Sequence, residues 1–269
     1  MAIPIGMLDS GVGGLTILRA VRELMPAQPV IYLADQAHVP YGVRQVDEVR
    51  RFSKEITRYL LDQGAQLIVV ACNTASTAAL KVLREEFSDR PFVGMEPAVK
   101  PAAEQTLTGV VGVLATYATF HNEVYNSVVE RFAKDVVLLQ DHCPGLVSQI
   151  EKGYLDGPET RAILERALQP MLEKGIDTVV LGCTHYPFVI PMIKQIVGPN
   201  VRVIDPAPAI ARQAKRLLDE RGWLAGESQP GSLRLITTGD PVTLSRNLPL
   251  YLGYPHEVES VTWRNDRLP

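Results

Sequence analysis

Short apolar runs rich in Val, Ile and Leu recur along the chain, and this pattern restricts the possible folds more than any other feature of the sequence. The runs occupy residues 3–8, 30–33, 67–71, 110–114, 136–139, 178–181 and 201–204. Each has the length and composition of a strand buried on both faces. Between them lie stretches of helical period, such as Val46, Val49, Phe52, Ile56 and Tyr59. The alternation predicts an α/β fold whose mainly parallel sheets are covered by helices.

Two proline-bearing stretches mark the expected crossings between two lobes. Residues 95–102 contain two prolines, and Asp205-Pro-Ala-Pro208 precedes a helical pattern at residues 210–218. We therefore expect residues 1–96 and the returning tail, 207–269, to form one lobe, and residues 97–206 to form the other. A chain of 269 residues is long enough to give each lobe its own core.

The charge and cysteine content indicate the class of partner and the compartment. Lys and Arg number 27 against 30 Asp and Glu, for a formal net charge of −3, and no basic block suggests a nucleic-acid surface. We expect a small-molecule partner. No uninterrupted apolar stretch of about 18 residues occurs, and no signal peptide is recognisable, so we expect a cytoplasmic protein without a membrane span. Three cysteines in such a chain are expected to be reduced.

Two of the cysteines lie in segments that echo each other. Residues 66–77 (QLIVVACNTAST) and 177–187 (DTVVLGCTHYP) each run a strand directly into a cysteine, Cys72 or Cys183. Asp9-Ser10 precedes the first cysteine by an interval similar to that between Thr116 and the second. Ligands of open parallel sheets bind beyond the carboxyl ends of the strands, where helix N-termini offer N–H groups to anions. Both cysteines are expected at such a position.

Two thiols in this setting suit the inversion of a C–H stereocentre. Inversion needs a base on one face of the carbon and an acid on the other, and a thiolate with a thiol supplies both. The chemistry needs no cofactor, only stabilisation of the carbanion. Ser10, Asn73, Thr74 and Thr184 are candidate anchors for substrate carboxylates. A strand-end cysteine taken alone is more often a packed apolar residue, and only the polar neighbours of Cys72 and Cys183 favour catalysis.

Two neighbours of the thiols each allow a structural and a functional interpretation. Asp9 could cap a helix beginning near Gly13, or relay protons beside Cys72. His185 could be a structural histidine, but its place two residues after Cys183 favours a role in tuning that thiol. Cys143, in His-Cys-Pro144, has no strand-end context and is assigned to packing.

The glycines after the first strand do not form a nucleotide site. In the pattern G-x-G-x-x-G read from Gly11, Thr16 occupies the third glycine position, and no Gly-Lys-Ser/Thr sequence occurs. The glycines fit a tight turn close to a bound carboxylate. Cys183-x-His185 is not a usual pair of zinc ligands and there is no C-x-x-C, so no metal site is expected.

Together these motifs resemble the glutamate racemases, which make D-glutamate for peptidoglycan without a cofactor. The resemblance spans nearly the whole chain, and the paired cysteine motifs alone are shared more loosely with aspartate and hydantoin racemases. The motifs that carry it are Asp9-Ser-Gly-Val-Gly-Gly-Leu-Thr16, Val39-Pro-Tyr-Gly42, Ala71-Cys-Asn-Thr-Ala75, Glu96-Pro-Ala98, Gly182-Cys-Thr-His-Tyr-Pro187 and Thr237-Thr-Gly-Asp240.

The resemblance implies a role for each site residue. Cys72 would act on D-glutamate and Cys183 on L-glutamate, with Asp9, Glu151 and His185 assisting proton transfer. It also implies two pseudosymmetric α/β lobes with the site between them, and usually a homodimer. The substrate-binding residues would be Asp9, Ser10, Tyr41, Gly42, Asn73, Thr74, Thr116, Thr119, Thr184 and His185.

Two departures from the family pattern lie near this site, and neither affects the thiols. The family's Gly-Thr-x-Gly-Thr run reads Ala115-Thr-Tyr-Ala-Thr119, so alanine replaces both glycines, and His38 stands where arginine is common. Three alternatives remain open. They are an aspartate racemase of the same fold, a hydrolase using Cys183 with His185 as nucleophile and base, which gives Cys72 no role, and a carboxylate-binding protein without catalysis.

Overall fold

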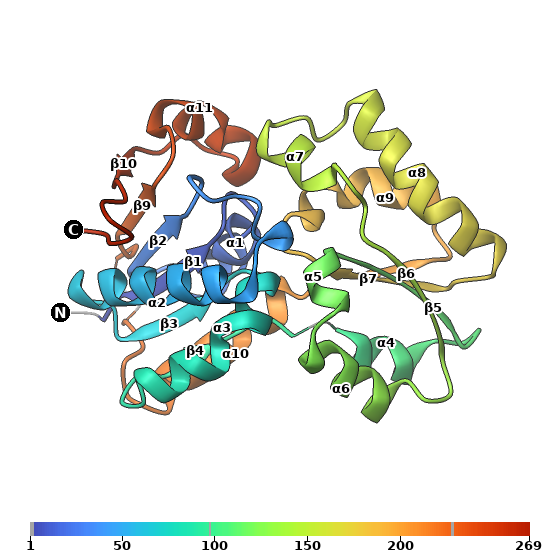
Figure 1. Cartoon of the computed structure of the whole chain (residues 1–269), viewed down its shortest axis with the longest axis horizontal. Helices are drawn as coiled ribbons and strands as arrows, with labels where there is room; N and C mark the ends of the chain where they lie inside the picture. The colour runs from blue at the N-terminus through green and yellow to red at the C-terminus, as the bar shows by residue number, and fades with distance from the viewer. Residues whose placement is uncertain (1–2, 97, 227–228) are drawn as a thin grey trace. The chain divides into compact units, whose positions relative to one another are not determined.

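The computed structural model describes residues 3–96, 98–226 and 229–269, which form two compact α/β units (Figure 1). The first unit spans Met1–Met95 and Ala207–Pro269, and the second spans Glu96–Pro206. The chain thus leaves the first unit at the start of one proline-bearing stretch and returns to it within the other. Residue 97, in the first of these stretches, lies outside the described residues. The α/β class predicted from the alternating pattern is confirmed.

The first unit is built around a six-stranded sheet in the order β10-β9-β2-β1-β3-β4, in which every pairing is parallel. In Figure 1, α2 crosses in front of this sheet. Helix α2 packs against α3, and α1 packs against α10 and α11. The elements are β1 (Ile5–Asp9), α1 (Leu15–Leu24), β2 (Val30–Ala34), η1 (Tyr41–Val43), α2 (Val46–Asp62), β3 (Leu67–Val70), α3 (Asn73–Glu86), β4 (Phe92–Val93), α10 (Ala207–Asp219), β9 (Leu233–Thr237), α11 (Pro241–Leu252) and β10 (Val258–Ser260).

The second unit has a four-stranded parallel sheet in the order β6-β5-β7-β8. Helix α4 packs against α6, and α8 packs against α7 and α9. The elements are α4 (Val99–Gln105), β5 (Val110–Ala115), α5 (Tyr117–Phe120), α6 (Glu123–Phe132), β6 (Val137–Asp141), α7 (Leu146–Glu151), α8 (Pro158–Glu173), β7 (Thr178–Gly182), η2 (Tyr186–Val189), α9 (Ile190–Val197) and β8 (Arg202–Ile204).

The two sheets share one strand order. The run β2-β1-β3-β4 in the first unit corresponds to β6-β5-β7-β8 in the second, so β1 matches β5 and β3 matches β7. Cys72 follows β3 and Cys183 follows β7. Asp9 ends β1, and Thr116 follows β5. The weak internal echo in the sequence therefore reflects equivalent positions in two similar sheets.

Helix α2 shows how the sequence pattern produces an element. It begins after a capping box, in which the Gln45 side chain accepts from the backbone at Glu48 and the Glu48 side chain accepts from the backbone N–H of Gln45. Its apolar stripe of Val49, Phe52 and Ile56 is buried in the core. No helix in the described part of the chain is both long and apolar enough to cross a bilayer.

Candidate active site

Cys72 lies where strand β3 passes into helix α3. It is the N-cap residue of α3, and its Sγ accepts a hydrogen bond from the backbone N–H of Ala75 at 3.4 Å. The residue is only 5% exposed. The first-turn N–H groups and the helix dipole favour negative charge at this end of a helix. A thiolate at Cys72 is therefore stabilised by the backbone itself.

Asp9 and Ser10 lie beside Cys72 because β1 pairs directly with β3. The Ser10 Oγ is 3.9 Å from the Cys72 Sγ. Asp9 is fully buried, and its Oδ2 accepts from the backbone N–H of Gly11 at 2.9 Å. The N-cap position of α1 is occupied by Gly14, and no side chain caps this helix end. Asp9 is therefore not the cap of this helix. The buried carboxylate instead lies one strand away from the thiol.

Gly14 has a specific packing function next to Asp9. A Cβ added at Gly14 would lie 2.8 Å from the Asp9 Cβ and 2.9 Å from the Tyr32 Oη. The Tyr32 hydroxyl in turn donates to the Gly11 carbonyl at 2.7 Å. The glycine therefore permits the close approach of α1 to the end of β1, as expected for a turn beside a site.

Asn73 is the most unusual polar residue in the first unit. It is only 2% exposed, at the first position of α3. Among the described residues, neither its Nδ2 nor its Oδ1 has a hydrogen-bond partner. An unsatisfied buried amide costs free energy, and native structures retain such groups mainly where a ligand or water completes them. Thr74, the next residue, is also buried.

The turn η1 brings Tyr41 and Gly42 to the same edge of the first unit. It packs against α3, and Tyr41 belongs to the same buried cluster as Cys72. The Tyr41 hydroxyl donates to the Asp35 Oδ2 at 2.6 Å. Burial, followed by the negative charge of Asp35 and smaller effects of Cys72 and Asp9, raises the pKa of Tyr41 well above its usual value. The phenol therefore stays protonated and close to the thiol.

In the second unit, Cys183, His185 and Glu151 form a continuous chain of contacts. The Cys183 Sγ is 3.8 Å from the His185 Nδ1, and the His185 Nε2 is 2.6 Å from the Glu151 Oε1. Glu151 is the last residue of α7, whereas the other two follow β7. Cys183 and His185 are nearly fully buried, and Glu151 is 12% exposed at its side chain.

The ionisation of His185 is set by opposing effects. Burial is the largest and disfavours the imidazolium, but the hydrogen bonds to Cys183 and Glu151 and their negative charges together outweigh it. The pKa of His185 is therefore raised well above its usual value. A protonated His185 at neutral pH stabilises negative charge on the sulfur of Cys183.

Thr116 and Thr119 lie at the end of β5, next to β7. Their hydroxyls are 2.9 Å apart, and the neighbouring Ala115 pairs with Gly182. A Cβ at Gly182 would lie 2.8 Å from the Ala115 Cβ. Alanine at position 115 is thus accommodated because residue 182 is glycine. Thr184 is buried beside Cys183.

Two further residues, to which the sequence motifs assigned no role, adjoin the clusters around Cys72 and Cys183. Asp35 holds the Tyr41 hydroxyl, and the Tyr186 hydroxyl donates to the His142 carbonyl at 3.2 Å. Asp35 had a detectable signal, since it lies two residues after the predicted strand 30–33, much as Asp9 follows the strand 3–8. Tyr186 directly follows His185 in the second cysteine motif. Burial is also the main cause that raises the pKa of Cys143 well above its usual value, so this thiol stays neutral.

The polar groups of each unit thus gather at the carboxyl ends of its parallel strands. Each cluster combines a buried thiol with a polar neighbour, Ser10 beside Cys72 and His185 beside Cys183. Within the described residues, no group of three or more His, Cys, Asp or Glu side chains lies in an arrangement that could hold a metal ion.

Comparison with known proteins gives consistent matches over the length of the chain. The sequence model of the Asp/Glu/hydantoin racemase family matches residues 15–214. A glutamate racemase from Roseiflexus is 49% identical over 241 residues, covering 89% of both chains. The structure of Escherichia coli glutamate racemase with L-glutamate and the activator UDP-MurNAc-Ala has a TM-score of 0.84 at 32% identity, covering 97% of this chain and 98% of that one. A Francisella tularensis glutamate racemase in complex with D-glutamate has a TM-score of 0.83 at 28% identity, with 97% and 98% covered.

Proposed function

The chain belongs to the Asp/Glu/hydantoin racemase family and is an enzyme that racemises glutamate, and we propose that Cys72 and Cys183 are its two acid/base groups. In this proposal both cysteines act on the α-carbon of one glutamate. Cys183 acts on the α-hydrogen of L-glutamate and Cys72 on that of D-glutamate. No cofactor takes part.

In the direction from L- to D-glutamate, the Cys183 thiolate removes the α-proton and forms an S–H bond as the C–H bond breaks. The electron pair remains on the α-carbon as a carbanion, which hydrogen bonds to the α-carboxylate stabilise. The Cys72 thiol then donates its proton to the opposite face and becomes a thiolate. The reverse reaction starts from this exchanged protonation state.

The neighbouring groups keep each sulfur in the required state. His185, charged at neutral pH and hydrogen-bonded to Glu151, stabilises the Cys183 thiolate. Asp9 assists proton transfer at Cys72, where the N-terminus of α3 stabilises the thiolate. Glutamate is held by groups at the same strand ends, with Ser10, Asn73, Thr74 and Thr184 as anchors for its carboxylates. The full set of substrate-binding residues is Asp9, Ser10, Tyr41, Gly42, Asn73, Thr74, Thr116, Thr119, Thr184 and His185.

The single observation that supports this proposal most is the equivalence of the two cysteines. Each follows the corresponding strand of a sheet with the same strand order, and each is buried beside a polar side chain, Ser10 at Cys72 and His185 at Cys183. A hydrolase that used Cys183 and His185 as nucleophile and base would give the equivalent cysteine, Cys72, no function. The complexes of relatives with L-glutamate and with D-glutamate support glutamate as the substrate.

The direct test is to incubate the purified protein in D₂O with L-glutamate, and separately with L-aspartate, without added cofactor. We expect optical rotation to disappear and α-deuterium to appear for glutamate alone, as followed by polarimetry and NMR. Turnover of aspartate alone would overturn the substrate assignment. A covalent adduct on Cys183 seen by mass spectrometry, without racemisation, would instead support the hydrolase.

The cellular role follows from the reaction. The protein would supply D-glutamate for peptidoglycan, acting in the cytoplasm where the precursors are assembled. We also propose that it works as a homodimer, as its family usually does. Size-exclusion chromatography with light scattering measures the oligomeric state.

Asn73 offers a test that separates binding from stability. Replacing Asn73 by leucine removes two buried polar atoms that have no partner among the described residues. We expect the free energy of unfolding of the ligand-free protein to stay constant or rise by about 1 kcal/mol, because an unsatisfied amide is lost. The KM for glutamate should rise about tenfold or more, because a substrate hydrogen bond is lost. Chemical denaturation and steady-state kinetics give the two quantities.

Ser53→Ala is the matched control for Asn73→Leu. Ser53 Oγ is likewise buried without a partner among the described residues, but it lies inside α2. Its replacement should leave KM unchanged and have a similar or smaller effect on stability. An unaltered KM in Asn73→Leu would contradict the proposed role of Asn73 in binding.

A further inference from the structure

The Asp35 carboxylate is a buried hub that receives four hydrogen bonds. It follows β2 and is fully buried. Its Oδ2 accepts from the Tyr41 hydroxyl at 2.6 Å and contacts the His38 Nδ1 at 2.9 Å. Its Oδ1 accepts from the Thr238 hydroxyl and from the Trp263 indole N–H, both at 2.7 Å. Four donors on one carboxylate restrict its orientation, and hence that of Tyr41.

Two of these donors come from the C-terminal part of the chain. Thr238 follows β9, and its hydroxyl also accepts from the Ala37 N–H at 3.0 Å. Trp263 lies in the final segment, residues 261–268, which begins with a hydrogen bond from the Val261 N–H to the Thr237 carbonyl. Residues more than 200 positions apart thus share one carboxylate.

The ring of Trp263 is fixed by packing as well as by its N–H. Its centroid lies 5.6 Å from that of Phe52 and 5.1 Å from that of His38. His38 in turn stacks on Phe52 with ring centroids 3.9 Å apart. Histidine at position 38, a departure from the family's usual arginine, therefore takes part in this cluster.

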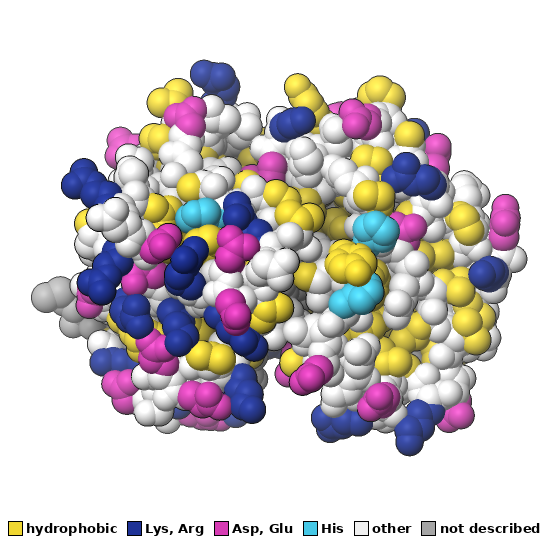
Figure 2. All heavy atoms as spheres, in the orientation of Figure 1, with side chains coloured by type: hydrophobic (Ala, Val, Ile, Leu, Met, Phe, Trp, Pro, Cys, Tyr) yellow, Lys and Arg dark blue, Asp and Glu magenta, His cyan; other side chains and the backbone are white. Residues whose placement is uncertain are grey.

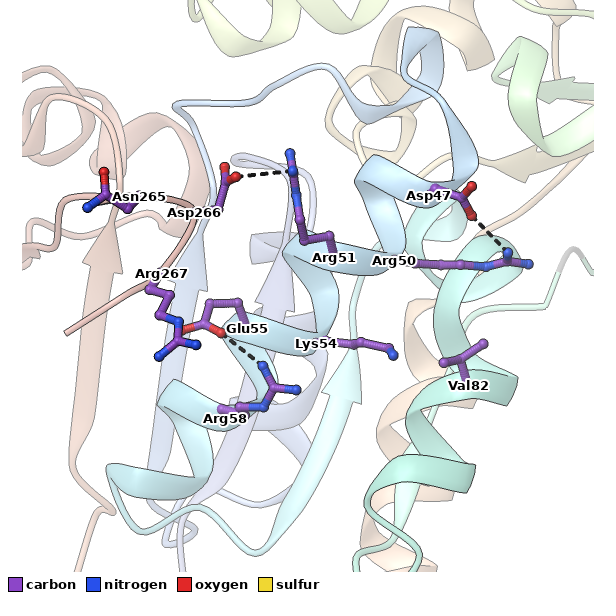
Figure 3. Close-up of a pocket in the computed structure, with 10 residues that line it drawn as sticks. All are labelled: Asp47, Arg50, Arg51, Lys54, Glu55, Arg58, Val82, Asn265, Asp266 and Arg267. Carbon is purple, nitrogen blue, oxygen red and sulfur yellow. Dashed lines mark hydrogen bonds and ion pairs between the residues drawn. The ribbon is translucent and has the colours of Figure 1, made fainter.

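The final segment is also anchored on α2. The Asp266 carboxylate accepts from Arg51 at 3.1 Å (Figure 3). The Leu268 N–H donates to the Glu55 Oε1, also at 3.1 Å. Leu268 is buried in the core of the first unit. Asn265 and Asp266 adopt positive φ angles. These angles turn the chain back, so that the backbones of Arg264 and Arg267 pair on either side of the turn.

The groove of about 530 Å³ in Figure 3 is the outer side of this anchor. Its cations are largely paired, and Figure 2 shows acidic and basic side chains interspersed on this face. The groove is therefore a seam between α2 and the final segment in which most of the cations are paired. The pairs drawn are Arg50 with Asp47, Arg51 with Asp266, and Arg58 with Glu55.

We propose that Asp35 and Trp263 are positioning residues, through which the C-terminal segment 261–268 holds the Tyr41 turn in the orientation that binds glutamate. This inference rests on the proposed role of Tyr41 and Gly42 in substrate binding. The segment contributes without touching the substrate. Loosening the hub should therefore weaken binding more than it slows the proton transfers at the two thiols.

Trp263→Phe tests the inference, because it keeps the ring packing and removes the N–H donor. We expect the KM for glutamate to rise about five- to tenfold, because the Tyr41 turn is held less firmly while its own contacts with substrate are kept, with kcat changed less than twofold. Trp223→Phe makes the same change elsewhere in the first unit and should leave KM unaltered. Trp223 lies next to Arg221, outside the hub.

Thr238 provides a second, independent variant with its own rescue. Thr238→Val removes the other Oδ1 donor and should also raise KM severalfold, whereas Thr238→Ser keeps the hydroxyl and should restore the wild-type value. Racemisation by the wild-type protein is measured first, and its absence would overturn the proposed function together with this inference. If the wild type racemises glutamate but both Trp263→Phe and Thr238→Val keep its KM, the positioning role is wrong while the proposed function stands.

Discussion

Replacing Cys183 by serine is expected to abolish racemisation while leaving exchange of the α-hydrogen of D-glutamate, and replacing Cys72 by serine is expected to do the reverse. A serine hydroxyl is a far weaker base than a thiolate at neutral pH, so inversion loses one of its two proton-transfer groups. The expected fall in kcat is about a hundredfold to ten-thousandfold. The remaining thiolate can still remove a proton from its own face and return a deuteron to it.

The assignment of each thiol to one face is tested by which enantiomer exchanges its α-hydrogen in each variant. The equilibrium constant between enantiomers is unity, so any variant must lose the same factor of kcat/KM in both directions. Overall rates therefore cannot assign a thiol to a face of the substrate. The assignment instead comes from α-deuterium incorporation without inversion, recorded by NMR for each enantiomer in D₂O. Exchange of the same enantiomer by both variants would contradict the assignment of Cys183 to L-glutamate and Cys72 to D-glutamate.

Cys143→Ser is the matched control in the same chain. Cys143 is buried in the second unit, and burial raises the pKa of its thiol, so it supplies no thiolate at neutral pH. We expect this variant to retain near-normal turnover in both directions. Alkylation by iodoacetamide should inactivate the wild-type enzyme, and glutamate should protect it. Inactivation traced only to Cys143 would refute the two-thiol assignment.

The sequence predicted seven strands, among them β6 and β8 at the edges of the second sheet, and missed three strands of the first sheet. All seven apolar runs are strands, within two residues at either end, and the inner strands among them are mostly apolar because they are buried on both faces. The strands β4, β9 and β10 were not predicted. β4 has two residues, and β10, with the sequence Val-Glu-Ser, is half-buried to exposed at the edge of its sheet. Such strands form through pairing with a neighbour, which leaves little pattern in their own residues.

The candidate site residues also divide into those with a local sequence signal and those without one. Cys72, Cys183 and their immediate neighbours could be recognised because strand ends and helix starts are local features. The contact between His185 and Glu151 joins positions 34 residues apart and depends on where α7 ends relative to β7. From the residues alone, Glu151 was an ordinary helix glutamate, and only the family resemblance singled it out. Trp263 reaches Asp35 from a segment with no recognisable motif.

Replacing Glu151 by glutamine is expected to shift the alkaline limb of the pH–rate profile to lower pH, so that activity is lost at a less alkaline pH than in the wild type. Glutamine keeps a hydrogen-bonding group beside the His185 Nε2 but removes the charge that helps to hold the pKa of His185 above its usual value. A hydrogen bond to a charged group contributes about 1.5–3 kcal/mol. A loss of this kind lowers the pKa of His185 towards its usual value. The alkaline limb of kcat for L-glutamate should therefore move to lower pH.

The stability of the same variant should depend on pH with a defined sign. Because the folded pKa of His185 lies above the unfolded value of 6.5, its stabilising effect is fully present below about pH 6.5 and is lost as pH rises through the folded pKa. The difference in unfolding free energy between wild type and Glu151→Gln should therefore be largest near pH 6 and shrink towards alkaline pH. Urea denaturation across this range measures it.

Glu165→Gln makes the same substitution in an exposed ion pair with Arg161 on the second unit. Exposed pairs contribute little, so neither its pH–rate profile nor its stability should change measurably. If Glu151→Gln also keeps the wild-type profile, the charge on Glu151 does not control His185, and the histidine must tune Cys183 without it. If kcat instead falls equally at every pH, Glu151 acts on the placement of the imidazole ring rather than on its protonation, because only a change in pKa gives a loss that grows with pH.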